Sequence, residues 1–522
     1  MEKITAWNIS SRKLELSAVF VAYFTSYFVL NSLNVAMPRI AADLDGMSIY
    51  SWAVSIPALA SAFVALIFGK LSDMYGRRTI LLFSIGFIVL GAVLSAMSQT
   101  FVMLILTLSI LVMGYGSVQP LCFSVLGDMY TPVERGLWAG LLNISSGIAA
   151  FIVPTLSGWL VDHWSWRAIF WIEVPLALIT GIVVLVGLPV LSKKAAHKID
   201  IQGAIYLALA TSTMILGISW AGNTYAWGSV QIIGLLSSST VFWVLFLRAE
   251  TKASEPMLAL EVLTNRSFIT ASLSALMSFF GLTAIMVYYP LFLQGVQNYN
   301  ATLSGNIITP FSVLMAFMGV PAGFLIAKTK RYKWMYIGGY AILTLVMFGM
   351  VALKADTTIG WGFLVSIIAG IGLGTIPTVN ALVVQYAVPK RLLGVATGGL
   401  YFFVAMGRSI SPAILGSAMN TVYARALAAS LPSNLDQVID QATLFSLSNP
   451  RVLLSEPAMT ELQNVFSGNG IQASVLFEQT VQAIRSALGA GLHVIFLIGA
   501  ITMLISFVLI LTIPEISLDG DL

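Results

Sequence analysis

The feature that most constrains this chain is a series of apolar runs, each long enough to cross a lipid bilayer as a helix. A spanning helix needs about 20 mostly apolar residues, and fourteen such runs follow one another. They lie near 16–38, 50–70, 79–98, 101–126, 137–160, 168–191, 202–222, 230–247, 268–293, 304–327, 335–353, 361–387, 393–420 and 487–513. Only 9% of the residues are charged, against roughly 25% in a soluble domain. We therefore predict an all-α polytopic membrane protein that resides in the lipid bilayer.

Basic residues are distributed unevenly between alternate loops. If the N-terminus is inside, most of the 26 Lys and Arg residues fall on the cytoplasmic side. The outer side then holds Arg39, Arg167, Lys354, Arg425, Arg451 and Arg485. Because basic residues stay on the side where they need not be translocated, we expect a cell-membrane protein with both termini in the cytoplasm. This scatter between apolar runs favours membrane orientation over a nucleic-acid partner.

The chain matches itself at a fixed offset, and Gly and Pro carry the match. The pairs are Gly114 and Gly116 with Gly372 and Gly374, Gly136 and Gly140 with Gly394 and Gly398, and Pro154 and Gly158 with Pro412 and Gly416. The alternative is a set of unrelated helix-packing glycines. A repeat predicts that spans 9–14 copy spans 1–6, that spans 7 and 8 are inserted, and that two like halves surround a central cavity.

These observations define the expected organisation. The segments are a cytoplasmic N-terminus at 1–15, a first half at 16–191, inserted spans 7 and 8 with their linker at 192–247, a cytoplasmic loop at 248–267, a second half at 268–513 and a cytoplasmic tail at 514–522. Within the second half, 421–486 is expected to be an extracellular loop. A helix start at Ser455-Glu456-Pro457 and an amphipathic stretch near 471–488 predict a helical hairpin there. A disordered connector is the alternative.

A charged motif connects spans 2 and 3. It reads Gly69-Lys-Leu-Ser-Asp-Met-Tyr-Gly-Arg-Arg78. Gly69 and Gly76 permit a tight turn, and Asp73 comes just before span 3, whose N-terminal dipole favours an anion. Arg77 and Arg78 can reach carboxylates of the next inner loop, such as Asp128 or Glu134. The alternative is a plain cluster of positive-inside charge.

This motif resembles the G-x-L-x-D-r-x-G-R-R signature of the major facilitator superfamily at every defining position. In that family the loop closes the cytoplasmic side in the outward-open state. The stretch Gly127-Asp-Met-Tyr-Thr-Pro-Val-Glu-Arg-Gly136, which includes Asp128, Glu134 and Arg135, is similar to the next inner loop of drug exporters. Trp166–Pro175 resembles the corresponding stretch of the fourteen-span drug:proton antiporters of the EmrB/QacA type.

The resemblance implies a major facilitator fold of 6+6 spans plus two central ones. It also implies a secondary active exporter of amphiphilic or drug-like compounds that works by alternating access. The expected partners are a small amphiphilic substrate, protons and the bilayer, and the expected state is a monomer without cofactor or metal. A lipid or metabolite transporter and a non-transporting sensor are the alternatives. No G-x-x-x-x-G-K-[ST] loop is present, which excludes an ATP-driven pump, and the three histidines are too dispersed for a membrane enzyme.

Three departures from that family bear on coupling. Span 1 has Val29 where an acid is common, and span 4 has Ile110 where an arginine is common. The antiporter motif of span 5 is reduced to Pro154 and Gly158, with Gly147 upstream and with Pro412 and Gly416 as repeat counterparts. Proton coupling and transport without it therefore both stay open.

Few ionisable groups are left inside the spans. Glu173 is a candidate proton or cationic-substrate site, and its alternative is an interfacial carboxylate paired with Arg167 or His163. Arg408 is a candidate substrate contact, and its alternative is a hydrogen bond to carbonyls freed by Pro412. Neutral polar residues within the spans are candidates for the cavity lining, although helix–helix hydrogen bonding is their commoner role. These are Asn31, Asn34, Asn143 and Asn380, together with Gln119 and Gln385.

Overall fold

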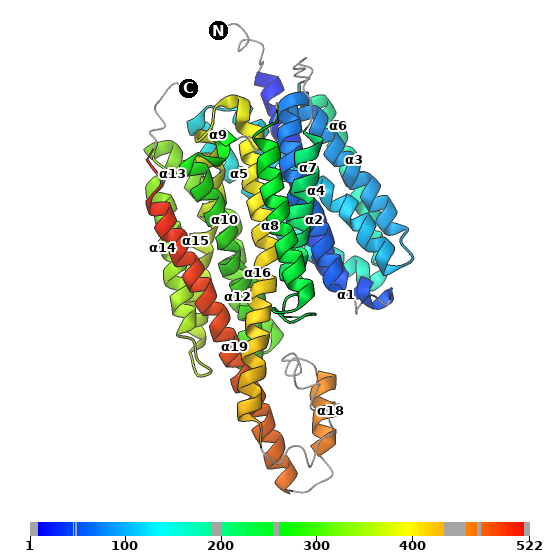
Figure 1. Cartoon of the computed structure of the whole chain (residues 1–522), viewed down its shortest axis with the longest axis vertical. Helices are drawn as coiled ribbons and strands as arrows, with labels where there is room; N and C mark the ends of the chain where they lie inside the picture. The colour runs from blue at the N-terminus through cyan, green and yellow to red at the C-terminus, as the bar shows by residue number, and fades with distance from the viewer. Residues whose placement is uncertain are drawn as a thin grey trace.

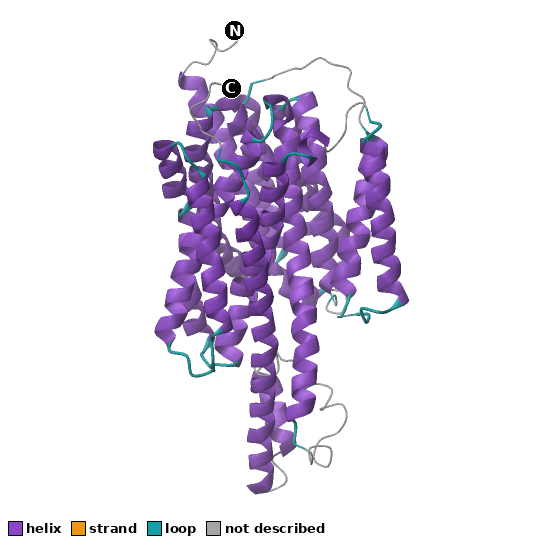
Figure 2. Cartoon of the chain, turned by 60° about the vertical axis from the view of Figure 1, so that its left-hand side comes forward, coloured by secondary structure: helices purple, strands orange, loops and turns teal. Residues whose placement is uncertain are grey.

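The computed structural model describes residues 9–44, 46, 50–189, 200–222, 224–253, 260–432, 456–466 and 471–515. Within these ranges almost every residue is helical and no β-strand forms (Figure 2). Fourteen helical segments are long and apolar enough to cross a membrane. The prediction of an all-α protein with fourteen spans is confirmed.

The first six spans are single helices. They are α1 (Ile9–Asp43), α2 (Tyr50–Tyr75), α3 (Arg77–Ala96), α4 (Phe101–Met129), α5 (Pro132–His163) and α6 (Arg167–Gly187). Side-chain caps and a glycine turn determine where several of these helices begin and end. Thr100 accepts a hydrogen bond from the Met103 backbone N–H at the start of α4, and Thr131 and Glu134 form a capping box at the start of α5. Gly76, with φ of 92°, makes the turn between α2 and α3 that a residue with a Cβ rarely adopts.

The remaining spans are more segmented. They are α7 (Ile201–Trp220), α8 (Val230–Glu250), α10 (Arg266–Thr283) continued by η2 (Ala284–Tyr288) and α11 (Tyr289–Gly295), α12 (Ala301–Phe317) with α13 (Gly319–Thr329), α14 (Lys333–Val351), α15 (Ile359–Tyr386), α16 (Leu393–Ser430) and α19 (Ile471–Leu511). Short helices are α9 (Leu260–Leu263), η3 (Lys390–Leu392) and α18 (Glu456–Phe466). The π-helical turn η2 ends two residues before Pro290, which lacks the N–H that a regular α-helix needs at that position.

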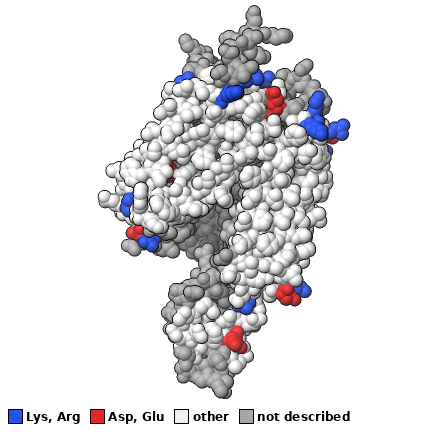
Figure 3. Space-filling model, turned by 180° about the vertical axis from the view of Figure 1, so that it is seen from behind, with Lys and Arg blue, Asp and Glu red and all other residues white. Residues whose placement is uncertain are grey.

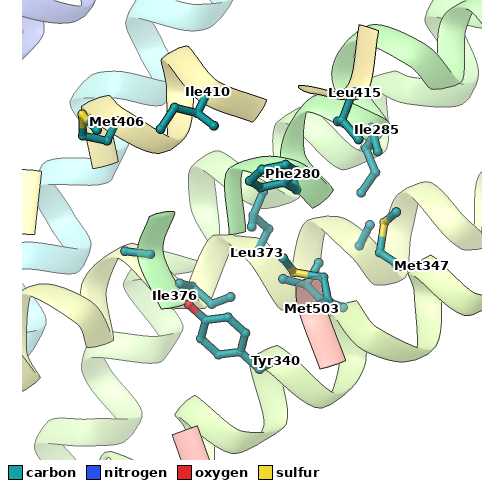
Figure 4. Packing of buried hydrophobic residues seen from close by; sticks show 14 of the residues in the cluster. Phe280, Ile285, Tyr340, Met347, Leu373, Ile376, Met406, Ile410, Leu415 and Met503 are labelled. Atoms are coloured by element: carbon teal, nitrogen blue, oxygen red, sulfur yellow. The ribbon is translucent and has the colours of Figure 1, made fainter. Parts of the chain in front are cut away.

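Two large hydrophobic cores, besides a small cluster of Phe28, Ala149 and Val153, hold the molecule together. One core consists almost wholly of buried side chains from α1 to α6. The other is drawn mainly from α10 to α19 and includes Phe280, Tyr340, Leu373, Met406 and Met503 (Figure 4). Leu59, Ala62 and Leu66 of α2 belong to this second core because α2 packs along α16. One core per half is what two rigid bodies facing each other require.

The bundle has two distinct ends. Helix α2 ends, α3 and α16 begin, and α19 finishes at the end drawn uppermost in Figure 1, which we call the latch end. At the opposite, far end, α16 and α19 extend beyond the other helices and α18 lies beside them. On the face shown in Figure 3, most basic side chains lie around the latch end, and a broad belt below it is almost free of charge.

The inserted hairpin of α7 and α8 lies across the seam between the halves. Helix α7 contacts both α2 and α16. Near the far end, the ring of Trp220 stacks on Trp52 of α2 at 5.5 Å, and Trp227 Nε1 donates to Ser417 Oγ of α16 at 2.8 Å. The hairpin is thus anchored to both halves.

The expected limits of the last two spans were too short. Helix α16 continues without interruption to Ser430, and α19 already begins at Ile471, so the segment 421–486 is partly helical extension of both spans. The Ala-rich stretch after Ser417 has high helix propensity, and Pro432 stops it. The predicted helix start at Ser455-Glu456-Pro457 agrees with α18, which begins at Glu456. Residues 433–455 and 467–470 lie outside the described residues.

Candidate gating and transport site

Arg77 is the centre of a charged cluster at the latch end. Its Nη2 lies 2.6 Å from Asp73 Oδ1, its Nε donates to Asp128 Oδ2 at 2.8 Å, and its Nη1 donates to Ser72 Oγ at 2.5 Å. The Arg77 side chain is buried and its charge is therefore desolvated, and the two carboxylates compensate for this cost. The predicted reach of Arg77 to Asp128 is what the structure shows.

Asp73 connects the two halves. Its Oδ1 accepts from the Gly394 backbone N–H at 3.1 Å and its Oδ2 from the Val395 backbone N–H at 2.9 Å. The first turn of α16 leaves its N–H groups without helical partners, and a carboxylate satisfies them with favourable charge. We expected the dipole of α3 to favour this carboxylate, but Asp73 lies in the last turn of α2 and binds the N-terminus of α16 instead. Asp73, Arg77 and Asp128 are called the latch below.

The other charged residues of the motif and of the next inner loop make different contacts. Glu134 does not reach an arginine, because its carboxylate accepts from the backbone N–H and hydroxyl of Thr131 at 3.2 and 2.9 Å. Arg135 donates to the carbonyls of Gly127 and Tyr130, the last carbonyls of α4. Arg78 forms no ion pair within the described ranges and lines a small pocket beside Glu15 and Arg77.

Glycines bring helices of the two halves into backbone contact at the same end. Gly69 of α2 faces Gly394 of α16, where a methyl group on Gly69 would lie 2.5 Å from the Gly394 carbonyl oxygen. Gly140 of α5 faces Gly319 of α13, where the corresponding distance is 2.2 Å. The two crossings join corresponding helices under the internal repeat, in which α16 copies α5, and α12 with α13 copies α2. Side chains would hold these helices apart, so the glycines permit a tight closure at the latch end.

Two further hydrogen bonds cross between the halves. Gln385 Nε2 of α15 donates to the Phe123 carbonyl of α4 at 3.0 Å. Asn143 Nδ2 of α5 donates to Thr378 Oγ1 of α15 at 3.0 Å. These amides join helices, which is the commoner of the two roles considered for them.

Glu173 is fully buried between α6 and α1. Its Oε1 accepts from Ser32 Oγ at 2.5 Å, and its Oε2 has no hydrogen-bond partner. The expected alternative, a pair with Arg167 or His163, is wrong. Arg167 donates to the Ser98 carbonyl at 2.8 Å and His163 Nδ1 hydrogen-bonds to the Trp159 carbonyl at 3.0 Å. The carboxyl group instead contacts α1 at Ser32, three positions after Val29.

Arg408 faces a cavity between the halves. Its guanidinium lies 5.8 Å from the ring centroid of Phe279 on α10, and it also lies close to Tyr115 of α4 and to Tyr401. The cavity has a volume of about 30 Å³ and is bordered by α2, α4 and α16. Its lining residues are Ala58, Ser61, Ala65, Tyr115, Gly116, Gln119, Tyr401, Val404, Ala405 and Arg408. Arg408 forms no hydrogen bond to a carbonyl within the described ranges, so the Pro412 alternative is not what the structure shows.

Neither Asn31 nor Asn380 is among the residues that line this cavity. Asn31 Nδ2 donates to the Tyr27 carbonyl of its own helix at 2.7 Å, and Asn380 Oδ1 accepts from the Tyr336 hydroxyl. The side chain of Asn34 lies outside the described residues. Tyr115 and Tyr401, which do line the cavity, were missed because tyrosines in apolar runs read as ordinary membrane aromatics.

The glycine and proline candidates differ in how closely neighbouring residues approach them. Gly147 faces Ala316 of α12, where an added methyl group would lie 2.8 Å from the Ala316 Cβ, and Gly416 faces the hydroxyl of Tyr288. An added methyl group at Gly158 would meet nothing within 4 Å. Pro154 and Pro412 both lie inside uninterrupted helices, and the Pro412 carbonyl accepts from Tyr288 at 3.4 Å.

Comparison with known proteins agrees with this architecture. The sequence model of the Major Facilitator Superfamily matches residues 19–412. Multidrug transporter protein MdtP of Bacillus subtilis (strain 168) is 28% identical over 515 residues, covering 98% of this chain and 94% of the relative. Multidrug resistance protein 3 of the same organism is 29% identical over 395 residues, covering 75% and 76%. The solved proton:xylose symporter XylE shares the fold, with a TM-score of 0.61 at 12% identity over 98% of this chain and 97% of that one. Since the family match runs from the first span into the thirteenth, across both halves, this chain belongs to the Major Facilitator Superfamily and is a membrane transporter.

Proposed function

We propose that this transporter is a proton-driven exporter of amphiphilic compounds, with the latch end in the cytoplasm and both halves supplied by one chain acting as a monomer. The names of the two relatives, a multidrug transporter and a multidrug resistance protein, support the class of substrate. The concentration of basic side chains at the latch end supports the orientation, because such residues are retained on the cytoplasmic side.

The latch and the two glycine crossings support alternating access. All of them join α2 to α16 or α5 to α13, and all lie at one end of the bundle. Opening that end requires Asp73 to leave the N-terminus of α16 and both crossings to separate. A transporter that alternates must make and break such contacts in each cycle.

The observation that carries the proposal of proton coupling is the buried carboxyl of Glu173. An ionised carboxylate in the membrane interior costs several kcal/mol unless a cation or enough hydrogen bonds stabilise it. Glu173 has one hydrogen bond, from Ser32, and no basic partner within the described ranges. Its neutral, protonated form suits this environment, and a conformation that admits water to it would favour release of the proton.

The test uses purified protein in proteoliposomes with an imposed pH gradient and a fluorescent amphiphile as probe. Glu173→Gln keeps the hydrogen bond to Ser32 but cannot titrate. We expect it to abolish accumulation driven by the pH gradient while leaving equilibrium binding of the probe within about twofold. Glu478→Gln, which changes an exposed carboxylate on α19, is the matched control and should accumulate the probe normally.

Other outcomes overturn the proposal in different ways. If Glu173→Gln still concentrates the probe against its gradient, proton coupling through this residue is wrong, and another ion or the membrane potential drives transport. If the unaltered protein only equilibrates the probe across the membrane, transport is facilitated diffusion. If the unaltered protein binds the probe without any flux, a sensor is the better account.

A further inference from the structure

The cavity between α2, α4 and α16 has an unbalanced charge. Arg408 is its only charged lining residue, and no carboxylate forms an ion pair with this guanidinium within the described ranges. The fully buried carboxyl of Glu173 lies between α1 and α6 and is not part of the lining. A guanidinium in the membrane interior is costly unless it is paired, so this site leaves the position of a counter-anion vacant.

The neutral polar groups around Arg408 also favour a bound anion. Gln119 is 5% exposed, and its Nε2 has no hydrogen-bond partner. The Tyr115 hydroxyl lies close to the Arg408 guanidinium, and Tyr401 and Ser61 complete the polar part of the lining. An amide N–H₂, hydroxyl groups and a guanidinium together present donors, and an oxyanion is the ligand that accepts from all of them.

The contributions come from both halves. Gln119, Tyr115 and Ser61 belong to α4 and α2, whereas Arg408 and Tyr401 belong to α16. An anion bound here would therefore contact both rigid bodies, which is the position from which a ligand influences their relative movement. The apolar members of the lining, such as Ala58, Ala65 and Val404, surround this polar spot with a surface suited to an amphiphile.

We propose that this cavity binds the anionic head group of an acidic amphiphile, such as a carboxylate or sulfonate, and that the transporter selects such anions over organic cations. The inference rests on the proposed function, which it narrows from amphiphiles in general to acidic ones. In the present conformation the cavity of about 30 Å³ is far below the roughly 300 Å³ of a drug-sized site, so it accommodates a head group only. The apolar tail requires the space that opens when α2 and α4 move away from α16.

The experiment compares three dansyl-labelled alkyl probes of equal chain length, which end in a carboxylate, an alcohol or a quaternary ammonium. Binding is measured by dansyl fluorescence on purified protein in detergent, and flux is measured in proteoliposomes. We expect the unaltered protein to bind the carboxylate at least tenfold more tightly than the ammonium. Arg408→Gln should remove this preference and leave binding of the alcohol within about twofold, whereas Arg408→Lys should restore part of it.

A second site separates recognition from loss of folding. Gln119→Met keeps the volume but removes the unpartnered donor, and it should weaken carboxylate binding severalfold without affecting the alcohol. Preference of the unaltered protein for the ammonium, or an unchanged carboxylate affinity in Arg408→Gln, overturns the inference. Transport of the alcohol or ammonium without anion preference overturns it while the proposed function stands. Binding of the carboxylate without flux of any probe contradicts the proposed function instead.

Discussion

Asp73 is the residue at which gating is most directly tested. Asp73→Asn keeps the shape of the side chain but removes its charge, so it weakens both the pair with Arg77 and the two hydrogen bonds to α16. The expected loss is about 1–3 kcal/mol, which shifts a two-state equilibrium many-fold away from the conformation closed at the latch end. Transport in vesicles should fall although the protein inserts in normal amounts.

Asp128→Asn is the matched control for this prediction. Asp128 contacts Arg77 but makes no hydrogen bond to α16 in the described part of the chain, and its side chain is 35% exposed. Its effect on transport should therefore be clearly smaller. Normal transport by Asp73→Asn, or equal losses in the two variants, would contradict the assignment of Asp73 as the residue that joins the halves.

At this scale the sequence predicted local contacts better than distant ones. The pair of Arg77 with Asp128 followed from two neighbouring loops. The bond from Asp73 to Val395 joins residues 322 positions apart, and no local pattern indicates it. Proximity in sequence also suggested a pair that does not form. Arg167 and Glu173 are six positions apart on α6, a spacing that places their side chains on different faces, so they do not meet.

At the scale of helices, the crossing of α5 with α13 offers a comparison within one element. Gly140→Ala introduces a methyl group 2.2 Å from the Gly319 carbonyl oxygen, so the helices must separate. Overpacking of this kind typically costs about 1–3 kcal/mol, and here the cost falls on the state closed at the latch end. We expect lower transport and a lower melting temperature for the purified protein.

Gly158→Ala supplies the control on the same helix, because a methyl group there meets nothing within 4 Å. It should leave transport unchanged, with stability equal or higher by up to about 1 kcal/mol through helix propensity. Equal behaviour of the two variants would show that the crossing need not be tight. The repeat in the sequence predicted which glycines correspond, but not which of them touch, because that depends on the packing of two separate halves.

At the scale of the whole molecule, the number and length of apolar runs were sufficient to predict fourteen spans. The extension of α16 beyond the bundle was not predicted, because a helix outside the membrane need not be apolar and hydropathy therefore does not detect it. The amphipathic pattern near 471–488 did predict a helix there, but not that this helix is continuous with the last span as α19. The repeat predicted a central cavity, but most of the residues that line it could not be predicted. It is formed by residues of α2, α4 and α16 that only the packing of the halves brings together.

Orientation is the property of the whole molecule that an experiment can settle most cleanly. Cys122 is fully buried and donates to the Val19 carbonyl, a hydrogen bond that a serine hydroxyl can also make, so Cys122→Ser is a suitable background without a native thiol. Single cysteines can then be placed at exposed positions. Lys252 follows α8 at the latch end, whereas Gly228, between α7 and α8, and Gln479 of α19 lie at the far end. If the latch end is cytoplasmic, a membrane-impermeant maleimide should label Gly228→Cys and Gln479→Cys in intact cells. It should reach Lys252→Cys only after permeabilisation.

External labelling at Lys252→Cys would reverse the orientation. Labelling of Gly228→Cys and Gln479→Cys from different sides would mean that the spans between them are miscounted. Because the basic residues of every connection at the latch end favour the same side, one consistent labelling pattern is the expected result.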